Sequence, residues 1–285
     1  MKEAILAALS KVTHPDLKGD LVTLGMIKAI DLKSDPVRIT VELTMPSSTL
    51  KQKIKDDCAK ALDAVKGLQF ELILTAKVSS KANKNSNNLS EVKNIILVLS
   101  GKGGVGKSTV ATNIALCLAR GGSKVGLLDA DIYGPSIPTM MGSDDKPTLS
   151  DDQKIIPLES HGIKIMSSGF LVDEDSALIW RGPMIHKIVH QFCKEVEWGP
   201  LDYLVLDLPP GTGDVQLSLS QIIPVVGAVM VTTPQQVAIA DVCRAESMLK
   251  TLNIPLLGII ENMSGYTHPE SGEIIHFFAE GGGKA

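Results

Sequence analysis

The sequence IILVLSGKGGVGKST at residues 95–109 joins an all-apolar run to a glycine-rich segment that ends in a lysine and two hydroxyl residues. The run Ile95–Leu99 is typical of a strand that is buried on both faces. The segment that follows matches the pattern G-x-x-x-x-G-K-[ST], and residues 109–120 then show helical apolar spacing. Strand, loop and helix in this order predict a phosphate-binding loop on a parallel sheet.

The residue types of this loop suit a bound nucleotide. The glycines let the backbone wrap with its N–H groups pointing inward, where they and the helix N-terminus hold anionic oxygens. We expect Lys107 to place its charge on the β- and γ-phosphates of ATP and the Ser108 hydroxyl to ligate Mg²⁺. Lys102 is either a solvated loop residue or the extra lysine of a deviant form of the motif. The candidate nucleotide-binding residues of the loop are Gly101, Lys102, Gly103, Gly104, Val105, Gly106, Lys107, Ser108 and Thr109.

Carboxylates stand at the ends of two other predicted strands. The strand at 124–129 ends in Asp129 and is followed by Asp131, and the strand at 203–207 ends in Asp207. Beside a phosphate loop, the C-terminal tips of parallel strands face the ligand crevice, where carboxylates hold Mg²⁺ waters or orient the attacking water. For Asp129, an ordinary turn residue at a strand end is the alternative. The candidate catalytic residues are Lys102, Lys107, Asp131 and Asp207, and the candidate Mg²⁺ ligands are Ser108 and Asp131.

The last predicted strand, at 256–261, leads into Asn262. An asparagine amide at a strand tip offers both a donor and an acceptor to the edge of a purine. The alternative is an asparagine that caps the strand or forms a turn.

A polar segment divides the chain. Residues 79–92, SSKANKNSNNLSEV, have almost nothing to bury and indicate a linker between a small α+β domain at 1–78 and a larger domain at 93–285. In the small domain we expect helices at 2–12 and 50–66 and strands at 21–32, 37–44 and 70–78. In the larger domain the pattern adds helices at 184–196, 214–222 and 236–251, a strand at 228–232, and a long irregular stretch before residue 184. Unalternated strands separated by helices predict a doubly wound, mostly parallel α/β sheet.

Composition excludes several classes of protein. With 44% hydrophobic and 21% charged residues the chain is not disordered throughout, and its formal charge of −4 argues against coating nucleic acid by bulk charge. The longest apolar runs fall short of the roughly 20 residues of a membrane span. The four cysteines, at 58, 117, 193 and 243, form no C-x-x-C pair and are expected to be small buried side chains on helices. We therefore expect a cytoplasmic protein whose partners are neither nucleic acid nor membrane.

On these motifs the chain resembles the Mrp/ApbC family of deviant Walker A ATPases, which are related to MinD and ParA. The small N-terminal domain resembles the accessory domain that also occurs in SufT-type proteins. The resemblance covers nearly the whole chain and is carried by GKGGVGKST (101–109), LLDADIYGPSIP (127–138), WRGPM (180–184), DYLVLDLPPGTGD (202–214), VTTPQ (231–235) and GIIENMS (258–264).

The resemblance implies an ATP-binding homodimer that takes part in assembling iron–sulfur clusters or transferring them to apoproteins. Its partners would then be iron–sulfur assembly proteins and apo-client proteins. Lys102 would be the signature lysine that reaches the nucleotide of a partner subunit, Asp131 and Asp207 the two switch carboxylates, and Asn262 the residue that contacts adenine.

The chain departs from the family pattern where cluster ligands are expected. The two cysteine positions of the family's cluster site correspond to His268 and Ser271, and the accessory domain's cysteine position is Ser48, so we expect no cluster ligands at these places. We also expect the sequence to belong to a longer product, because family members continue beyond this C-terminus. Two alternatives stay open: an ATP-dependent assembly or scaffold partner that does not itself ligate a cluster, and a positioning ATPase of the MinD or ParA kind.

Overall fold

The computed structural model describes residues 1–44, 48–80, 89–132, 134–171, 182–211, 223–276, 278 and 281. The chain separates into two compact units, of which the first is Met1–Ser79 with Arg120–Ser123 and the second is Ser80–Ala119 with Lys124–Ala285. Each unit has a hydrophobic core of its own. We propose that the polar segment at 79–92 links a small domain at 1–78 to a larger domain at 93–285.

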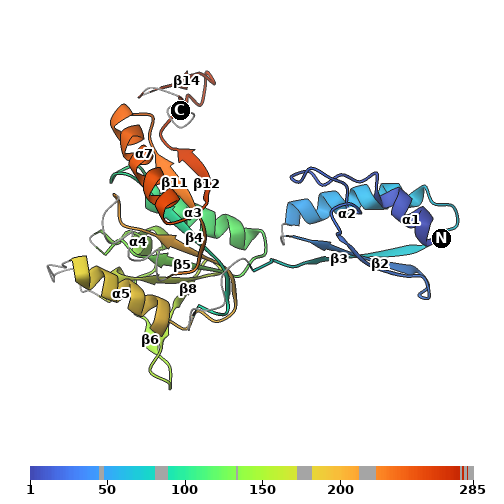
Figure 1. Ribbon diagram of the computed structural model, residues 1–285, viewed down its shortest axis with the longest axis horizontal. Coiled ribbons are helices and arrows are strands. Elements are labelled where there is room, and N and C mark those ends of the chain that lie inside the picture. The colour runs from blue at the N-terminus through green and yellow to red at the C-terminus, as the bar shows by residue number, and fades with distance from the viewer. Residues whose placement is uncertain are drawn as a thin grey trace. The chain divides into compact units, whose positions relative to one another are not determined.

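The small unit packs two helices on one face of a three-stranded sheet (Figure 1). Its elements are α1 (Lys2–Leu9), β1 (Ile27–Asp31), β2 (Val37–Leu43), α2 (Ser48–Asp63) and β3 (Phe70–Ala76). In the sheet β2 is central, antiparallel to β1 and parallel to β3. Every second side chain of β2 from Ile39 to Leu43 is buried, because successive strand residues point to opposite faces. These residues share one core with Ile5 of α1 and Ile54 of α2.

The strand expected at 21–32 is only partly right. The strand begins at Ile27, because residues 21–25 form a turn instead. The Asp20 carboxylate accepts hydrogen bonds from the N–H groups of Val22 and Thr23, at 2.9 Å each, and Gly25 has a φ of 67°. A carboxylate that bonds to the backbone two and three residues ahead competes with strand pairing, so the local turn prevails over the apolar pattern.

The large unit contains a seven-stranded sheet in the order β12-β11-β4-β10-β5-β9-β8. All neighbours are parallel except β8, which runs antiparallel to β9. The strands are β4 (Val92–Leu99), β5 (Val125–Asp129), β8 (Leu158–Ser160), β9 (Ile163–Ser167), β10 (Leu201–Asp207), β11 (Val225–Thr232) and β12 (Leu256–Glu261). Two small antiparallel pairs lie outside it, β6 (Thr148–Leu149) with β7 (Ile155–Ile156) and β13 (Tyr266–Thr267) with β14 (Ile274–Ile275). The doubly wound α/β class expected from the sequence is confirmed.

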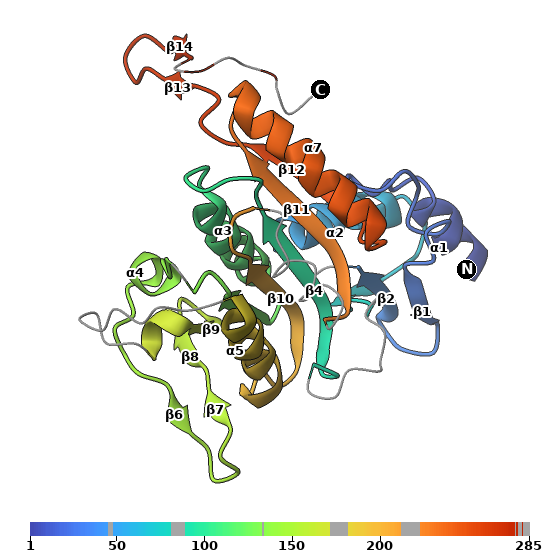
Figure 2. The ribbon, with the colours of Figure 1, turned by 60° about the vertical axis from the view of Figure 1, so that its left-hand side comes forward.

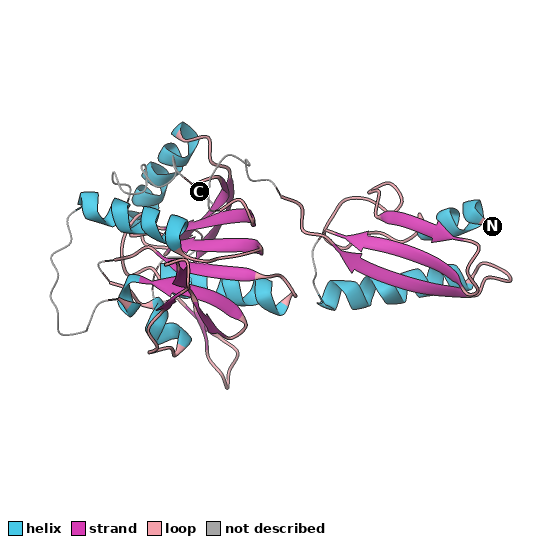
Figure 3. Cartoon of the chain, turned by 90° about the horizontal axis from the view of Figure 1, so that it is seen from below, coloured by secondary structure: helices cyan, strands magenta, loops and turns pink. Residues whose placement is uncertain are grey.

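Helices cover both faces of this sheet (Figure 3). The helices α3 (Lys107–Arg120) and α4 (Ile137–Met141) share a core with Val98 of β4. The helices α5 (Gly182–Glu195) and α7 (Gln236–Thr251) share the other core, which contains Leu97 of the same strand, and α7 runs along β11 and β12 (Figure 2). Neighbouring residues of β4 therefore face opposite layers, as they must in a strand buried on both sides. The helix expected at 214–222 lies outside the described residues.

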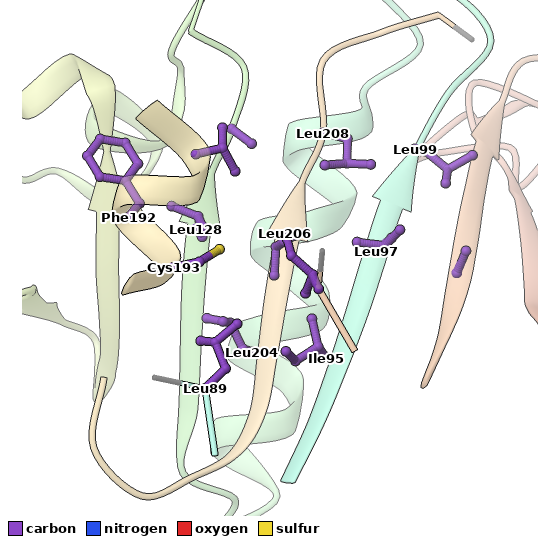
Figure 4. Packing of buried hydrophobic residues seen from close by; sticks show 14 of the residues in the cluster. Leu89, Ile95, Leu97, Leu99, Leu128, Phe192, Cys193, Leu204, Leu206 and Leu208 are labelled. Carbon is purple, nitrogen blue, oxygen red and sulfur yellow. The ribbon is translucent and has the colours of Figure 1, made fainter. Parts of the chain in front are cut away.

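The core below α5 is built from leucines of adjacent strands (Figure 4). Leu97, Leu204 and Leu206 are at most 1% exposed, and Phe192 and Cys193 of α5 pack in the same cluster. Burying each such side chain stabilises the fold by about 1.5–3 kcal/mol relative to leaving it in water.

The prediction that the cysteines are buried is right for two of them and wrong for two. Cys58 and Cys193 are buried, but Cys117 and Cys243 are exposed. On α7 the buried positions include Val242 and Ala245, and Cys243 follows one residue after Val242. One residue turns a helix by about 100°, which rotates this side chain away from the sheet.

The stretch before residue 184 is less irregular than the sequence suggested. It contains α4, the four strands β6 to β9, and a 3₁₀ turn, η1 (Ser168–Phe170). The strand β9 pairs in parallel with β5 and extends the central sheet. It was not predicted because only five residues form it and it follows the three-residue strand β8 directly after the turn at 161–162.

At the opposite side of the sheet, β12 pairs only with β11 among the described residues. Its side chains are poorly covered on both faces, with Leu257 54% exposed on one face and Ile260 37% exposed on the other. No helix in the described ranges combines the length and apolar character that crossing a bilayer requires.

Candidate nucleotide site

The C-terminal ends of the central strands meet at one edge of the large unit's sheet. The register pairs Asp207 of β10 with Val98 of β4 on one side and with Asp129 of β5 on the other. The loop from β4 to α3 begins at this edge and borders a cavity of about 240 Å³. The cavity is lined by Ser100, Lys102, Gly103, Gly104, Gly106, Lys107, Ser108, Thr109, Asp131, Ser136, Met140 and Pro210.

Two glycines of the loop are required by their surroundings. Gly106 has a φ of 85°, which L side chains rarely adopt, and a Cβ atom there would overlap the Nδ2 atom of Asn262. Gly101 packs so closely on α7 that a Cβ atom would overlap Asp241. The loop is therefore held between α7 on one side and the segment that follows β12 on the other.

Lys107 is a buried cation surrounded by acidic groups. Its side chain is 6% exposed, and its Nζ atom lies 2.6 Å from Oδ1 of Asp207 and 3.7 Å from Oδ2 of Asp131. The same ammonium donates a hydrogen bond to the Ser108 hydroxyl at 3.3 Å. A buried ion pair of this kind is retained only when each charge has a partner, because an isolated buried charge is very costly. The two carboxylates together compensate the charge of Lys107.

The two oxygens of the Asp207 carboxylate have different surroundings. Burial raises the pKa of its carboxyl, and the charge and hydrogen bond of Lys107 oppose that rise. Its Oδ1 atom accepts the Lys107 hydrogen bond, whereas the buried Oδ2 atom has no hydrogen-bond partner among the described residues. A buried carboxylate oxygen without a partner suits an additional ligand such as a water molecule.

Asp129 has a different arrangement from the other two carboxylates. Its Oδ1 atom accepts the N–H of Asp131 at 3.1 Å, and its Oδ2 atom accepts the N–H of Ile137 at 3.3 Å and the hydroxyl of Ser167 at 3.0 Å. Burial, and next the charge of Asp207, raise the pKa of Asp129 to about 7. Of the two alternatives for Asp129, the turn residue at a strand end describes these contacts, which tie the segment from Asp131 to α4 onto β9.

Lys102 lies at the rim of the cavity with a neutral partner. Its Nζ atom donates a hydrogen bond to Oε1 of Gln235 at 2.8 Å, and its carbonyl accepts the Ser100 hydroxyl at 2.9 Å. Gln235 precedes α7 as its N-cap residue, and its side chain makes no capping hydrogen bond. The two lysines of the loop are therefore held in different ways, Lys102 by an amide and Lys107 by carboxylates.

Asn262 connects the end of β12 to the loop. Its Nδ2 atom donates to the carbonyl of Val105 at 2.9 Å, and its backbone N–H donates to the carbonyl of Thr232 at 2.8 Å. Its Oδ1 atom accepts the N–H of Met263 at 3.0 Å. These contacts place Asn262 against the phosphate loop, and its contact with adenine stays a prediction.

The structure brings most of the residues singled out from the sequence together at the cavity, and it adds others that the sequence analysis did not single out. Lys107, Ser108, Asp131 and Asp207 lie together, although Asp207 stands about 100 positions after Lys107. Gln235 was not singled out, and neither were the lining residues Ser136, Met140 and Pro210. The signal for Gln235 was its place in VTTPQ, at the C-terminal end of a predicted parallel strand, where ligand-facing residues gather.

The positions that correspond to the family's cysteine pair form a turn that is closed by hydrogen bonds. The Nδ1 atom of His268 accepts the N–H groups of Glu270 and Ser271 at 3.3 Å each, and the Ser271 hydroxyl accepts the N–H of Glu273 at 3.3 Å. Ser48, the third such position, is the first residue of α2. In the part of the chain that the structure describes, no three His, Cys, Asp or Glu side chains are grouped as a metal site.

The chain matches two family models. Residues 91–285 match the ParA family, described as NUBPL iron-transfer P-loop NTPase, and residues 2–71 match the family described as iron–sulfur cluster assembly protein. It is 47% identical over 285 residues to an iron–sulfur cluster carrier protein of Deinococcus radiodurans, an alignment that spans 100% of this chain and 81% of the relative. To the Escherichia coli K12 protein of that name it is 44% identical over 287 residues, across 99% of this chain and 77% of the relative.

A solved structure agrees with these relationships. The nucleotide-binding protein of Archaeoglobus fulgidus in complex with ADP superimposes with a TM-score of 0.62 at 42% identity, over 69% of this chain and 77% of that one. The family model covers residues 91–285, which include the candidate site, and the two relatives align along 99–100% of the chain. The chain therefore belongs to the NUBPL iron-transfer family of P-loop nucleoside triphosphatases, as its resemblance to the iron–sulfur carrier ATPases indicated.

Proposed function

We propose that this chain binds ATP with Mg²⁺ in the cavity of the large unit and uses its hydrolysis to assemble iron–sulfur clusters or to deliver them to apoproteins. The observation that carries the proposal is the buried ammonium of Lys107, held between Asp207 and Asp131 at the mouth of a glycine-rich loop. The names of its relatives and the ADP in the similar solved structure support the same assignment.

The phosphates would be held by the loop and by Lys107. The N–H groups of the loop and the N-terminus of α3 attract anionic oxygens. On binding, Lys107 would exchange its carboxylate partners for phosphate oxygens, so its positive charge stays compensated throughout. Asp207 and Asp131 fix the side chain of Lys107 beside the loop, so the lysine is positioned for this exchange.

The oxygens beside Lys107 fit a magnesium ion. Mg²⁺ prefers hard oxygen donors and keeps several of its waters, and this site offers the Ser108 hydroxyl and the Asp131 carboxylate, 14% exposed. We propose these two residues as its protein contacts. The ion would neutralise charge on the phosphate oxygens as it develops in the reaction.

Asp207 is suited to hold the attacking water. Its Oδ2 atom is buried without a partner among the described residues and would accept a hydrogen bond from that water. When Lys107 moves to the phosphates, Asp207 loses the charge that lowers its pKa, which strengthens it as a proton acceptor. Lys102 would supply further charge to phosphate oxygens, in a homodimer whose subunits share their nucleotide sites.

The test replaces Lys107 by alanine in the full chain. Removing the buried cation that lies between these carboxylates should abolish ATP turnover, measured as phosphate release with Mg²⁺, and should lower ATP affinity by calorimetry. Lys154→Ala, an exposed lysine of the same unit, is the matched control and should hydrolyse ATP like the parent chain. Unchanged hydrolysis by a folded Lys107→Ala protein would refute the proposal.

A second candidate keeps the ATPase and leaves the cluster to other proteins. Iron–sulfur clusters are held mainly by thiolates. Burial raises the pKa of Cys58 and of Cys193 to about 12, which disfavours their thiolates, while Cys117 and Cys243 are exposed on separate helices. The His268 and Ser271 positions are already used in hydrogen bonds to the backbone. These facts favour a scaffold or docking partner in a reducing cytoplasm over a carrier that ligates its own cluster.

Anaerobic reconstitution with iron and sulfide separates the two candidates. A carrier that bridges one four-iron cluster across a dimer would bind about two irons per chain, whereas a scaffold without ligands would bind none. If iron is found, its loss in a Cys117→Ser, Cys243→Ser protein would identify the exposed cysteines as the ligands. Sedimentation with liposomes or DNA only in the presence of ATP would instead favour a positioning ATPase.

A further inference from the structure

The two lysines of the phosphate loop have different hydrogen-bond partners. Lys107 has two carboxylates within 4 Å, whereas Lys102 forms no salt bridge in the described part of the chain and donates to the Gln235 amide at 2.8 Å. The Lys102 charge is therefore held in place without being neutralised. A cation held by a neutral acceptor is ready for transfer to an anion, because a hydrogen bond between two charged groups is stronger than one to an amide.

The surroundings keep this contact in a fixed place. Gly101 packs against α7 at Asp241 so tightly that no side chain would fit, which fixes the path of the loop just before Lys102. Gln235 is held from the other direction, since its carbonyl accepts the N–H groups of Ala238 and Ile239 in the first turn of α7. Lys102 also lines the phosphate cavity, so its ammonium lies beside the space in which a nucleotide would be bound.

We propose that Gln235 is a positioning residue that holds the Lys102 ammonium beside the start of α7 until a nucleoside triphosphate takes it. The inference rests on the proposed binding of ATP in this cavity. The neutral amide matters, because a carboxylate at the same place would hold Lys102 as an ion pair and compete with the phosphate. The start of α7 thereby changes its contacts when the nucleotide arrives.

The direct test measures the reactivity of the Lys102 amine, which does not depend on ATP turnover. The full chain without nucleotide is acylated with an amine-specific reagent, and labelling at Lys102 is quantified by mass spectrometry against Lys154 as internal reference. Gln235→Ala should raise Lys102 labelling roughly two- to tenfold, the range of one net hydrogen bond. Gln235→Glu should lower it, because an ion pair holds the amine in its protonated form. Equal labelling of Lys102 in the parent chain and both variants overturns the inference.

A matched control stands next to Gln235 in the sequence. Gln236→Glu introduces the same charge at the first residue of α7 and acts on the helix dipole in the same way. Gln236 is exposed, and the hydrogen bond of the Lys102 ammonium goes to Gln235 instead. It should leave Lys102 labelling unchanged. If Gln236→Glu lowers the labelling as much as Gln235→Glu does, the effect is one of general charge and the inference is wrong.

ATP turnover provides the second measurement and separates the two hypotheses. Gln235→Glu should hydrolyse ATP more slowly than Gln236→Glu, and in a Lys102→Met background the Gln235→Glu change should have no further effect. The same loss with and without Lys102 counts against Gln235 as its positioning residue. A parent chain that hydrolyses no ATP contradicts the proposed function, and the labelling result still decides whether Gln235 holds Lys102.

Discussion

Single residues at the cavity show how charge is balanced within the site. Lys107 is compensated by carboxylates that would otherwise be buried without a partner. Each charge of the group offsets part of the desolvation cost of burying the others. Asp207 keeps one oxygen without a partner among the described residues, and Lys102 keeps its charge. A hydrated phosphate group in the cavity would meet these two groups, the Oδ2 atom of Asp207 and the ammonium of Lys102.

At the same scale, Asp129 predicts a dependence of stability on pH. Its pKa is about 7 in the fold against an ordinary value of 3.8, so between these values the folded chain binds more protons than the unfolded one. Stability from this group is complete below about pH 4 and is lost as the pH rises towards 7. Asp129→Asn should therefore flatten the decline of the free energy of unfolding between these values, as measured by urea denaturation.

The exposed Asp145 is the control for this prediction. Asp145→Asn should leave the slope of stability against pH as it is in the parent chain. A slope that is identical in the parent and in Asp129→Asn would show that Asp129 binds protons equally in the folded and the unfolded chain.

At the scale of elements, the buried strands carry the fold and the edge strand contributes little. Leu206 of β10 is completely buried between α5 and the neighbouring strands, whereas Leu257 of β12 is 54% exposed. We expect Leu206→Ala to cost about 2–5 kcal/mol of unfolding free energy, and Leu257→Ala less than about 1 kcal/mol. Chemical denaturation measures both, and equal losses would contradict the difference in packing.

The sequence indicated those elements whose pattern is local. The run at 95–109 predicts strand, loop and helix together, because apolar continuity, glycines and helical spacing stand side by side. The strand β9 gave no such signal, because so short a strand is recognised only through its pairing with β5 and β8. The contact of Lys102 with Gln235 joins residues 133 positions apart, and no local rule brings them together.

The prediction that Cys117 and Cys243 are buried was wrong for a related reason. Apolar spacing showed that α3 and α7 have a buried side but did not fix its exact direction. A difference of one residue, as between Val242 and Cys243, separates a buried position from an exposed one.

At the scale of the molecule, the two units have separate cores and are expected to unfold separately. Ile54 is 1% exposed in the core of the small unit, which contains no residue of the large sheet. Ile54→Ala should lower the melting temperature of one of two transitions in differential scanning calorimetry and leave the other in place. A single transition that shifts as a whole would show that the units unfold as one.

The outer strand of the large sheet has a practical consequence. The backbone of β12 is paired on one side only in the described part of the chain, and apolar side chains flank that open side. Such a strand is a template on which any extended segment can add itself, including the same strand of a neighbouring molecule. Solutions of this chain should therefore form high-molecular-weight species as the concentration rises, and a lysine placed at Ile259 should slow their appearance in light scattering.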